Sequence, residues 1–230
     1  MYTEVIDNTR LSVEVEETDN RCHKYLLDLP GLYQAKNLLT VLASCEQLVS
    51  KGFAIEQNQI DEGLAYSKKI TGLHGRWEIL KKSPLVVLDV AHNADGIRQL
   101  IQQFKETKYE KLHLILGVVK DKDTDALLSL LPADAFYYFT KAQIPRALPE
   151  EELQKKAARF NLKGNAYTTV NTALYAASLK ASKNDLIIIC GSIFVAGEVS
   201  MEAVKEIWGK DGYSTGALDA FEMAAWTFFR

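Results

Sequence analysis

Hydrophobic and polar residues alternate over two short stretches near the start of the chain, RLSVEVEE from Arg10 and CHKYLLDLPG from Cys22. This alternation predicts two half-buried strands separated by a polar turn. The next segment repeats apolar residues at helical spacing up to Gly52, and IEQNQIDEGLAYS predicts a second, shorter helix. Two strands and two helices make a poor core alone, so we interpret residues 1–72 as the end of a larger domain.

From residue 73 onward, continuous apolar runs alternate with helical segments. Strands are predicted within WEIL, LVVLDV, LHLILGV, AFYYFT, NAYTTV and DLIIICGSI. Helices are predicted from Ala94, from Asp123 to Leu131, from Pro149 to Phe160, from Thr172 to Ala181 and from Ala196 to Trp208. This order predicts an α/β fold over residues 73–208, with a mostly parallel sheet covered by helices on both faces. Residues 209–230 are ambiguous, and we expect a helix there.

Composition and charge narrow the classes of partner. The 230 residues include 27 basic and 30 acidic residues, which gives a net charge of −3 and argues against nucleic acid and anionic membranes as partners. No apolar run reaches the roughly 18 residues of a membrane span. Three cysteines far apart in sequence favour a reducing, cytoplasmic compartment, and Cys45 and Cys190 are expected to be small core residues.

Several common catalytic motifs are absent from the sequence. It contains no GxxxxGK[ST], GxGxxG, HExxH, CxxC or GxSxG, and its four histidines lack metal-ligand spacing. A zinc enzyme and a dinucleotide-dependent dehydrogenase are therefore disfavoured. We expect no metal ligands in this chain.

The most informative local signal is the junction between the strand LVVLDV and the helix that follows it. Asp89 ends a strand whose carboxyl end is expected to face a ligand crevice, where its carboxylate can accept two ribose hydroxyls. His92 and Asn93 fall at the start of the helix, where free amide donors favour an anion. The alternative, equally compatible with the spacing, is that Asn93 only caps the helix and His92 is a surface imidazole.

Three further segments hold candidate ligand-binding residues. Arg76 precedes a strand and can reach a phosphate or ribose, but taken alone the simpler interpretation is an exposed arginine, because a Gly-Arg pair carries little information. The segment Lys120, Asp121, Lys122, Asp123 follows the third apolar strand and can form a loop that faces a phosphate or a base. The simpler interpretation is a solvated turn in which Asp123 caps the next helix. Gly191 permits close backbone approach, and Ser192 can bind a carboxylate or cap a helix.

In combination these motifs are more specific than each is alone. Five segments between Leu73 and Val199 resemble the folylpolyglutamate synthase/dihydrofolate synthase family of the Mur-ligase superfamily. In chain order they are GRWEIL, VVLDVAHNADG, LGVVKDKD, IPRAL and CGSIFVAGEV. Upstream, DLPGLYQAKNLLTVLA is similar to the end of that family's central ATPase domain. Gln34 and Asn37 match the family pattern, whereas Tyr33 stands where histidine is usual. Ala94 stands where the family usually has proline.

The resemblance implies a Rossmann-like C-terminal domain over residues 73–208, preceded by the end of a P-loop domain. It implies an ATP-dependent, ADP-forming ligase of folate biosynthesis and one-carbon metabolism. Such an enzyme joins L-glutamate to a folate or dihydropteroate carboxylate through an acyl phosphate. ATP and Mg²⁺ are the implied cofactors, with the phosphate loop and the magnesium ligands in a part of the enzyme that precedes these residues. The chain alone is then expected to be inactive.

The resemblance also implies roles for individual residues. Arg76 and Asp89 are the expected nucleotide contacts, and His92 and Ser192 the expected glutamate contacts, with His92 the catalytic residue nearest the acyl phosphate. Asn93 is expected to shape the turn. The segment from Lys120 to Asp123, including Asp121 and Lys122, matches a family loop without a definite role for each residue. The complete enzyme is expected to be a monomer, and self-association of this chain is left open.

Two other functions remain open from the sequence. A Mur-type peptide ligase of cell-wall synthesis has the same fold, but such enzymes tend to carry tyrosine where Val90 stands, which favours the folate branch. A nucleotide-binding module without catalytic activity is the second alternative.

Overall fold

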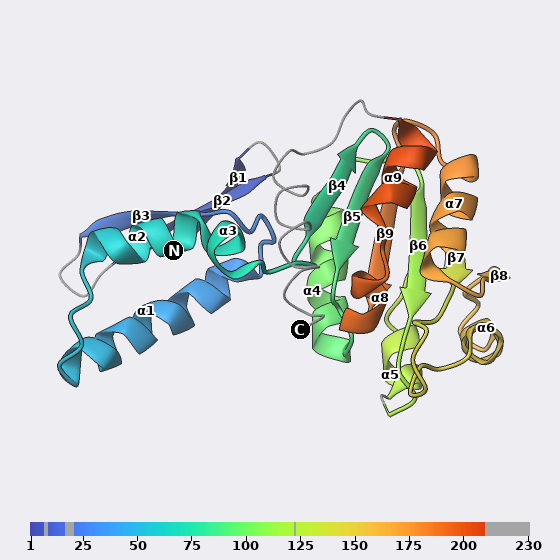
Figure 1. The fold of residues 1–230 in the computed structure, drawn as a ribbon, viewed down its shortest axis with the longest axis horizontal. Coiled ribbons are helices and arrows are strands. Elements are labelled where there is room, and N and C mark those ends of the chain that lie inside the picture. Colours follow the sequence, from blue (N-terminus) through green and yellow to red (C-terminus); the bar gives the residue numbers. More distant parts are fainter. Residues whose placement is uncertain (7–8, 17–20, 122, 210–230) are drawn as a thin grey trace. The chain divides into compact units, whose positions relative to one another are not determined.

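The computed structural model describes residues 1–6, 9–16, 21–121 and 123–209. These residues form two compact units, Met1–Trp77 and a second that begins at Glu78 (Figure 1). The assignment of the first segment to an ATPase domain stays a prediction. The C-terminal helix expected within residues 209–230 and the residue Lys122 lie outside the described part of the chain.

The first unit is a three-stranded antiparallel sheet with helices packed on it. Strands β1 (Tyr2–Ile6), β2 (Arg10–Glu16) and β3 (Cys22–Leu27) lie in the order β1-β2-β3. The helices are α1 (Gln34–Ser50), α2 (Gln57–Ala65) and α3 (Ser67–Thr71). The two predicted strands and two predicted helices are confirmed, whereas β1 and α3 were not predicted. The buried core of this unit consists of Leu11, Val13, Tyr25, Leu27, Ala35 and Leu38.

The second unit is built on a six-stranded sheet in the order β4-β5-β9-β6-β7-β8. Its strands are β4 (Glu78–Lys82), β5 (Leu85–Asp89), β6 (Leu112–Gly117), β7 (Phe136–Phe139), β8 (Gly164–Ala166) and β9 (Leu186–Gly191). Its helices are α4 (Ala94–Lys105), α5 (Thr124–Leu128), α6 (Glu150–Ala158), α7 (Val170–Lys180), α8 (Ile193–Gly197) and α9 (Met201–Trp208). All neighbouring strands are parallel except β4 and β5, which confirms the predicted mostly parallel sheet.

Helices cover both faces of this sheet. Helices α7 and α9 contribute to one buried core with alternate strand residues, among them Leu88 of β5 and Ile189 of β9. Successive strand residues point to opposite faces, so Asp89 and Cys190 lie on the other face. Helix α4 contacts α5, and α5 contacts α6, while α7 contacts β6 and β7 (Figure 1). The chain passes from β5 through α4 to β6 and only later inserts β9 between these two strands.

The single predicted helix from Ala196 to Trp208 is wrong, because the structure has two helices there. Ser192 caps α8 and Ser200 caps α9, and both capping oxygens accept a backbone N–H inside their helix. The break between the helices is held by Asn171, whose side chain accepts from Ser200 N (3.1 Å) and donates to Glu198 O (3.1 Å). A local sequence pattern could not reveal this clamp, because Asn171 is 27 residues from Glu198 in sequence.

Two smaller expectations differ from the structure. Cys190 is buried as predicted, but Cys45 is only partly buried, since α1 extends beyond the core of the first unit. The short strand predicted from NAYTTV ends earlier, because Thr169 caps α7 and the helix begins at Val170.

Candidate functional site

The carboxyl ends of β5, β9 and β6 lie side by side at one edge of the parallel sheet. Asp89 pairs in register with Cys190, and Gly191 pairs with Gly117 on the other side of β9. Ser192 follows β9 directly and donates its backbone N–H to Gly117 O at 3.1 Å. The candidate residues Asp89 and Ser192, 103 positions apart in sequence, are thus carried by neighbouring strands at the same edge.

Gly191 is required where β9 meets β6. Its φ is +128°, a backbone conformation that L side chains rarely adopt. A Cβ atom built on Gly191 would lie 1.9 Å from Gly117 O. The predicted close backbone approach at this glycine is therefore confirmed.

Asp89 is a buried carboxylate, 5% exposed, and it lies beside Cys190. The pKa of the Cys190 thiol is raised, mainly by burial and further by the negative charge of Asp89. Cys190 therefore stays a neutral thiol and behaves as a packing residue. The only anionic group of this pair is Asp89.

His92 and Asn93 form the turn between β5 and α4. The ring Nδ1 of His92 lies 3.1 Å from Val90 O. Because a carbonyl oxygen only accepts, we assign the proton to Nδ1, which leaves Nε2 as the nitrogen that can act on a ligand. Asn93 caps α4: its Oδ1 accepts from Gly96 N at 2.7 Å. The cap interpretation of Asn93 is confirmed, and this side chain holds the end of the turn in place.

Ser192 is 6% exposed and is the N-cap of α8. Its Oγ accepts from Val195 N at 3.3 Å. A hydroxyl that accepts through its oxygen still has a proton to donate, so capping does not exclude a bond from Ser192 to a carboxylate.

The loop after β6 has structural partners for the residues that the structure describes. Lys120 Nζ donates to Pro145 O at 3.2 Å, and Asp121 pairs with Arg146 at 2.7 Å. Asp123 caps α5 by accepting from Ala126 N at 3.0 Å. The simpler interpretation, a turn with Asp123 as the helix cap, is therefore confirmed for Asp123.

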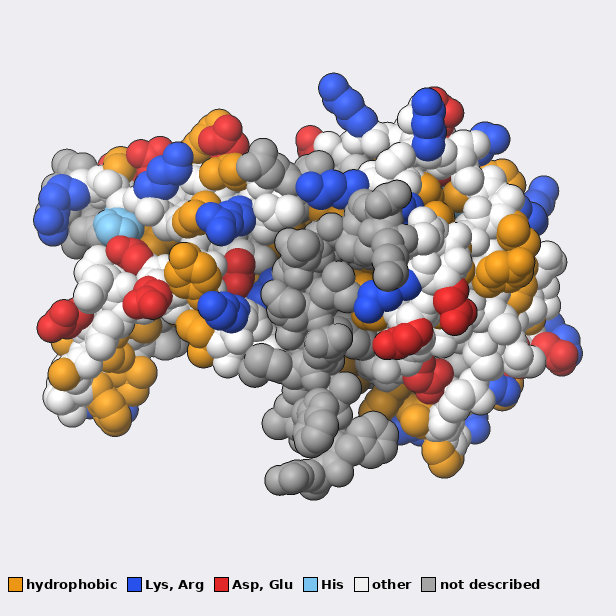
Figure 2. Space-filling model, turned by 45° about the horizontal axis from the view of Figure 1, so that its top comes forward, with side chains coloured by type: hydrophobic (Ala, Val, Ile, Leu, Met, Phe, Trp, Pro, Cys, Tyr) orange, Lys and Arg blue, Asp and Glu red, His pale blue; other side chains and the backbone are white. Residues whose placement is uncertain are grey.

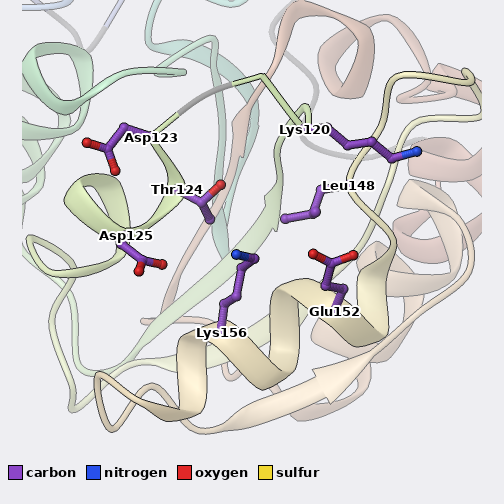
Figure 3. A pocket seen from close by; sticks show the side chains of 7 residues that line it. All are labelled: Lys120, Asp123, Thr124, Asp125, Leu148, Glu152 and Lys156. Atoms are coloured by element: carbon purple, nitrogen blue, oxygen red, sulfur yellow. The ribbon is translucent and has the colours of Figure 1, made fainter.

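A pocket of about 430 Å³ adjoins this loop. Figure 3 shows Glu152 and Lys156 pointing into it from α6, opposite side chains at the start of α5 and in the two loops that follow β6 and β7. The complete lining consists of Lys120, Asp123, Thr124, Asp125, Leu148, Glu152 and Lys156. Glu152 and Lys156 were not candidates from the sequence, where the spacing of four residues on a helix was their only signal.

Sequence reasoning also gave no role to Arg146 and Phe194. The guanidinium of Arg146 lies 6.0 Å from the centre of the Phe194 ring, two residues after Ser192. This contact and the Asp121–Arg146 ion pair connect the segment after β9 to the two loops beyond β6 and β7. Only the three-dimensional arrangement reveals this connection, because Asp121 and Arg146 come from separate loops and Phe194 from α8.

The upstream candidates belong to the first unit. Arg76 is half-buried and follows Gly75, which has a φ of +72°. Its predicted action together with Asp89 stays a prediction. Of the residues that match the family pattern upstream, Asn37 Nδ2 donates to Gln34 Oε1 at 2.7 Å at the start of α1.

Two kinds of feature are absent from the described residues. No cluster of three or more His, Cys, Asp or Glu side chains that could hold a metal ion was found among them. No helix in this part of the chain combines the length and the apolar character that crossing a membrane requires.

Comparison with known proteins gives consistent matches. A family model described as Mur ligase, glutamate ligase domain, matches residues 75–193. The chain is 32% identical over 185 residues to a probable bifunctional folylpolyglutamate synthase/dihydropteroate synthase of Haloferax volcanii, covering 79% of this chain and 21% of that protein. It is 30% identical over 187 residues to the folylpolyglutamate synthase of Lacticaseibacillus casei, covering 80% of this chain and 41% of that protein.

A solved structure gives the same match in three dimensions. The structure of Escherichia coli FolC in complex with DHPP and ADP superposes with a TM-score of 0.64 and 27% identity, over 89% of this chain and 45% of that chain. The chain thus spans less than half the length of each of these relatives.

Proposed function

The chain belongs to the Mur ligase, glutamate ligase domain family, and from this membership we propose that it supplies the glutamate-binding part of a folylpolyglutamate/dihydrofolate synthase. In the proposed reaction, a folate or dihydropteroate carboxylate oxygen takes the γ-phosphoryl group of ATP, and ADP leaves. The amine of L-glutamate then attacks the carbonyl carbon of the acyl phosphate. Phosphate leaves from the tetrahedral intermediate, the nitrogen loses a proton, and an amide results.

Asp89 is the proposed nucleotide contact of the second unit. Asp89 lies at the carboxyl end of β5, next to β9, which is inserted between β5 and β6. A carboxylate at this place in a parallel sheet is well placed for the two hydroxyls of a ribose. Arg76 is the proposed second contact, to the ribose or a phosphate.

His92 and Ser192 are the proposed glutamate contacts. The hydroxyl proton of Ser192 is available for a carboxylate of glutamate. With the Nδ1 proton of His92 directed to Val90 O, the Nε2 atom is left for the reacting groups. A neutral Nε2 can accept a proton from the attacking amine, and a protonated one can stabilise the developing anion. Asn93 would act only by holding the turn that presents His92.

The loop from Lys120 to Asp123 has a weaker place in the proposal. Asp123 is engaged as a helix cap, and Asp121 in an ion pair with Arg146. These contacts favour a role for the loop in shaping the edge of the sheet. The ammonium of Lys120 is the described group of this loop with the most suitable charge for an anionic substrate.

Mg²⁺ would neutralise the phosphates of ATP during the phosphoryl transfer. The carboxylates of this edge do not suit it well, since the described residues offer no cluster that could hold a metal ion. We therefore propose that the magnesium ligands come from the part of the ligase that this chain does not span. We further propose a cytoplasmic, monomeric enzyme; the three cysteines, all free in the structure, are compatible with a reducing compartment.

The observation that carries the proposal is the convergence of Asp89 and Ser192 at one sheet edge, within a match to the glutamate ligase domain. Val90, where cell-wall ligases tend to carry tyrosine, favours folate over a cell-wall precursor as the acceptor. The test is ADP release by a ligase in which this chain completes the nucleotide-binding half of the Lacticaseibacillus casei enzyme.

The proposal predicts ADP release that requires both L-glutamate and a folate or dihydropteroate, and none from this chain alone. Release with a cell-wall precursor in place of folate would select the cell-wall ligase instead. Nucleotide binding without any amino-acid-dependent release would select the non-catalytic module.

A further inference from the structure

The loops that follow β6 and β7 are joined by backbone hydrogen bonds. Leu148 N donates to Val118 O at 2.9 Å, and Lys120 N donates to Arg146 O at 3.0 Å. An antiparallel bridge lies between these two bonds. The backbone of Arg146 is therefore held at a fixed place beside the carboxyl end of β6, the strand that pairs with β9.

The side chain of Arg146 is oriented from two directions. Its Nη2 donates to Asp121 Oδ2 at 2.7 Å, and its guanidinium carbon lies 6.0 Å from the centre of the Phe194 ring. Phe194 belongs to α8 and comes two residues after Ser192. Both side chains of the Asp121–Arg146 pair are 56% exposed, and an ion pair with that exposure contributes little to stability. Stability alone therefore does not explain why a guanidinium reaches across this edge to α8.

The guanidinium of Arg146 retains donors for a ligand. It has five N–H groups in one plane, and one carboxylate accepts two of them at most in the paired geometry. Asp121 therefore leaves part of the exposed guanidinium able to donate. A guanidinium already oriented by a carboxylate and an aromatic ring loses less conformational freedom when a second carboxylate binds. Arg146 thus has the chemistry of a carboxylate-binding group.

L-Glutamate brings two carboxylates to the proposed site, where Ser192 offers a neutral hydroxyl to one of them. The chain has a net charge of −3, and Figure 2 shows basic and acidic side chains interspersed over the face of the second unit that it draws. A substrate with two negative groups is therefore not attracted by a general positive field. Its recognition requires an individual cation near Ser192.

Two other cations follow β6 and β7, and both have partners on the side of α6. Lys141 Nζ pairs at 2.9 Å with Glu150, whose side chain is 11% exposed. Lys120 Nζ donates to Pro145 O at 3.2 Å, and Lys120 lines the pocket beside α6. Arg146, in contrast, contacts α8 itself through Phe194.

We propose that Arg146 binds the side-chain carboxylate of the incoming L-glutamate and thereby selects glutamate over amino acids with neutral side chains. Ser192 then holds the α-carboxylate, next to the amine that attacks the acyl phosphate. The inference rests on the proposed function, because it adds a residue to the same glutamate site and names what that residue recognises.

The first test is a titration of the chain with L-glutamate, followed by NMR through the Nε–H signals of its arginines. All the proposed glutamate contacts lie in the second unit, so the chain alone suffices. The Arg146 signal is identified by its loss in Arg146→Lys. L-Glutamate should shift this signal in a saturable way. L-Glutamine, which has the same length without the charge, should require at least a tenfold higher concentration.

Arg159 provides a matched internal control in the same spectra. It is also 56% exposed, pairs with an aspartate, Asp125, and lies 5.8 Å from the centre of a ring, Phe160. Its ring partner is its neighbour in sequence, however, and not a residue of α8. The Arg159 signal should stay in place. The proposal is overturned if the Arg146 signal does not move, or if it responds equally to both amino acids.

The second test compares amino acids in the ligase completed with the nucleotide-binding half of the Lacticaseibacillus casei enzyme. Arg146→Gln should raise the KM for glutamate about tenfold to hundredfold, the usual effect of losing a hydrogen bond to a charged group. The KM for ATP, and kcat/KM with L-glutamine as the acceptor amine, should not change. Arg146→Lys keeps the charge and should recover part of the preference for glutamate, and Arg159→Gln should leave that preference intact. An equal loss with both amino acids in Arg146→Gln would overturn the proposal, because it would show that Arg146 only shapes the edge.

The two tests separate this inference from the proposed function. A glutamate-specific shift of the Arg146 signal, in a chain whose completed ligase releases no ADP, would contradict the proposed reaction and support the role of Arg146. Glutamate-dependent release of ADP that Arg146→Gln leaves unchanged would do the reverse.

Discussion

Gly191 lies so close to Gly117 that a Cβ atom on Gly191 would sit 1.9 Å from the carbonyl oxygen of Gly117. The same carbonyl accepts the backbone N–H of Ser192 at 3.1 Å. The contact between the two glycines thus determines where β9 ends and fixes the position of the backbone that carries the Ser192 side chain. The geometry of the candidate site depends on a side chain being absent at this position.

Gly191→Ala should destabilise the protein by about 2–4 kcal/mol, because it combines an unfavourable φ with a steric overlap against backbone. Urea unfolding followed by circular dichroism measures the change. Gly197→Ala is the matched control, since no atom lies within 4 Å of the Cβ position there and φ is not positive. Equal midpoints for the two variants would show that the strands can separate to admit a methyl group.

Asn93→Ala should cost about 1 kcal/mol of stability, the usual effect of losing an N-cap, because Gly96 N loses its acceptor. Asn93→Ser keeps a capping oxygen and should stay within a few tenths of a kcal/mol of the unchanged chain. If Asn93 only shapes the turn, Asn93→Ser should also retain the KM for glutamate in the completed ligase. A raised KM for glutamate with normal stability would instead make Asn93 a direct substrate contact.

His113 should make stability depend on pH. Its ring is 1% exposed, with Nδ1 2.9 Å from the Tyr138 hydroxyl and Nε2 3.4 Å from an Asp185 carboxylate oxygen. The pKa of His113 is lowered, chiefly by burial, which outweighs the opposite effect of Asp185. The folded state therefore binds fewer protons than the unfolded state below about pH 6.5, the ordinary pKa of histidine. The stability that neutral His113 supplies is complete above that pH and is lost as the pH falls toward the folded-state pKa.

The measurement is the free energy of unfolding in urea at pH 7.5 and pH 5.5. His113→Phe should be less stable at pH 7.5 but should lose less stability on acidification, by up to about 1.4 kcal/mol per pH unit. An identical pH dependence in His113→Phe would assign the effect to other groups.

The periodicity of the sequence predicted those parts of the fold that local patterns determine. The buried strand ending at Asp89 and the helix beginning at Ala94 appear at the predicted residues, because an unbroken apolar run and an amphipathic repeat meet there. The prediction of one continuous helix from Ala196 was wrong, because the break between α8 and α9 is held by hydrogen bonds from Asn171, which lies in α7. The partial exposure of Cys45 was also missed, since helical spacing identifies an apolar face without showing what covers it.

The candidate site divides in the same way. Gly191 and Ser192 could be identified from the sequence as candidates, because they stand where a buried apolar run ends and a helix is expected to follow. Their position beside Gly117 and Asp89 could not, since the insertion of β9 between β5 and β6 is a property of the topology alone. The contact of Arg146 with Phe194 likewise depends on loops that the sheet brings together.

Steady-state kinetics of Asp89→Asn and Ser192→Ala in the completed ligase test the central claim, that this sheet edge binds both nucleotide and glutamate. Ser200→Ala is the control for Ser192→Ala, because it also removes a helix cap but lies away from the edge. Loss of a hydrogen bond to a charged group corresponds to about a tenfold to hundredfold change in affinity.

We predict that Asp89→Asn raises the KM for ATP by about that factor and leaves the KM for glutamate unchanged. Ser192→Ala should raise the KM for glutamate by a similar factor and leave the KM for ATP unchanged, and Ser200→Ala should change neither KM. KM values for both substrates that stay unchanged in Asp89→Asn and Ser192→Ala, in an enzyme that turns over normally, would contradict the account.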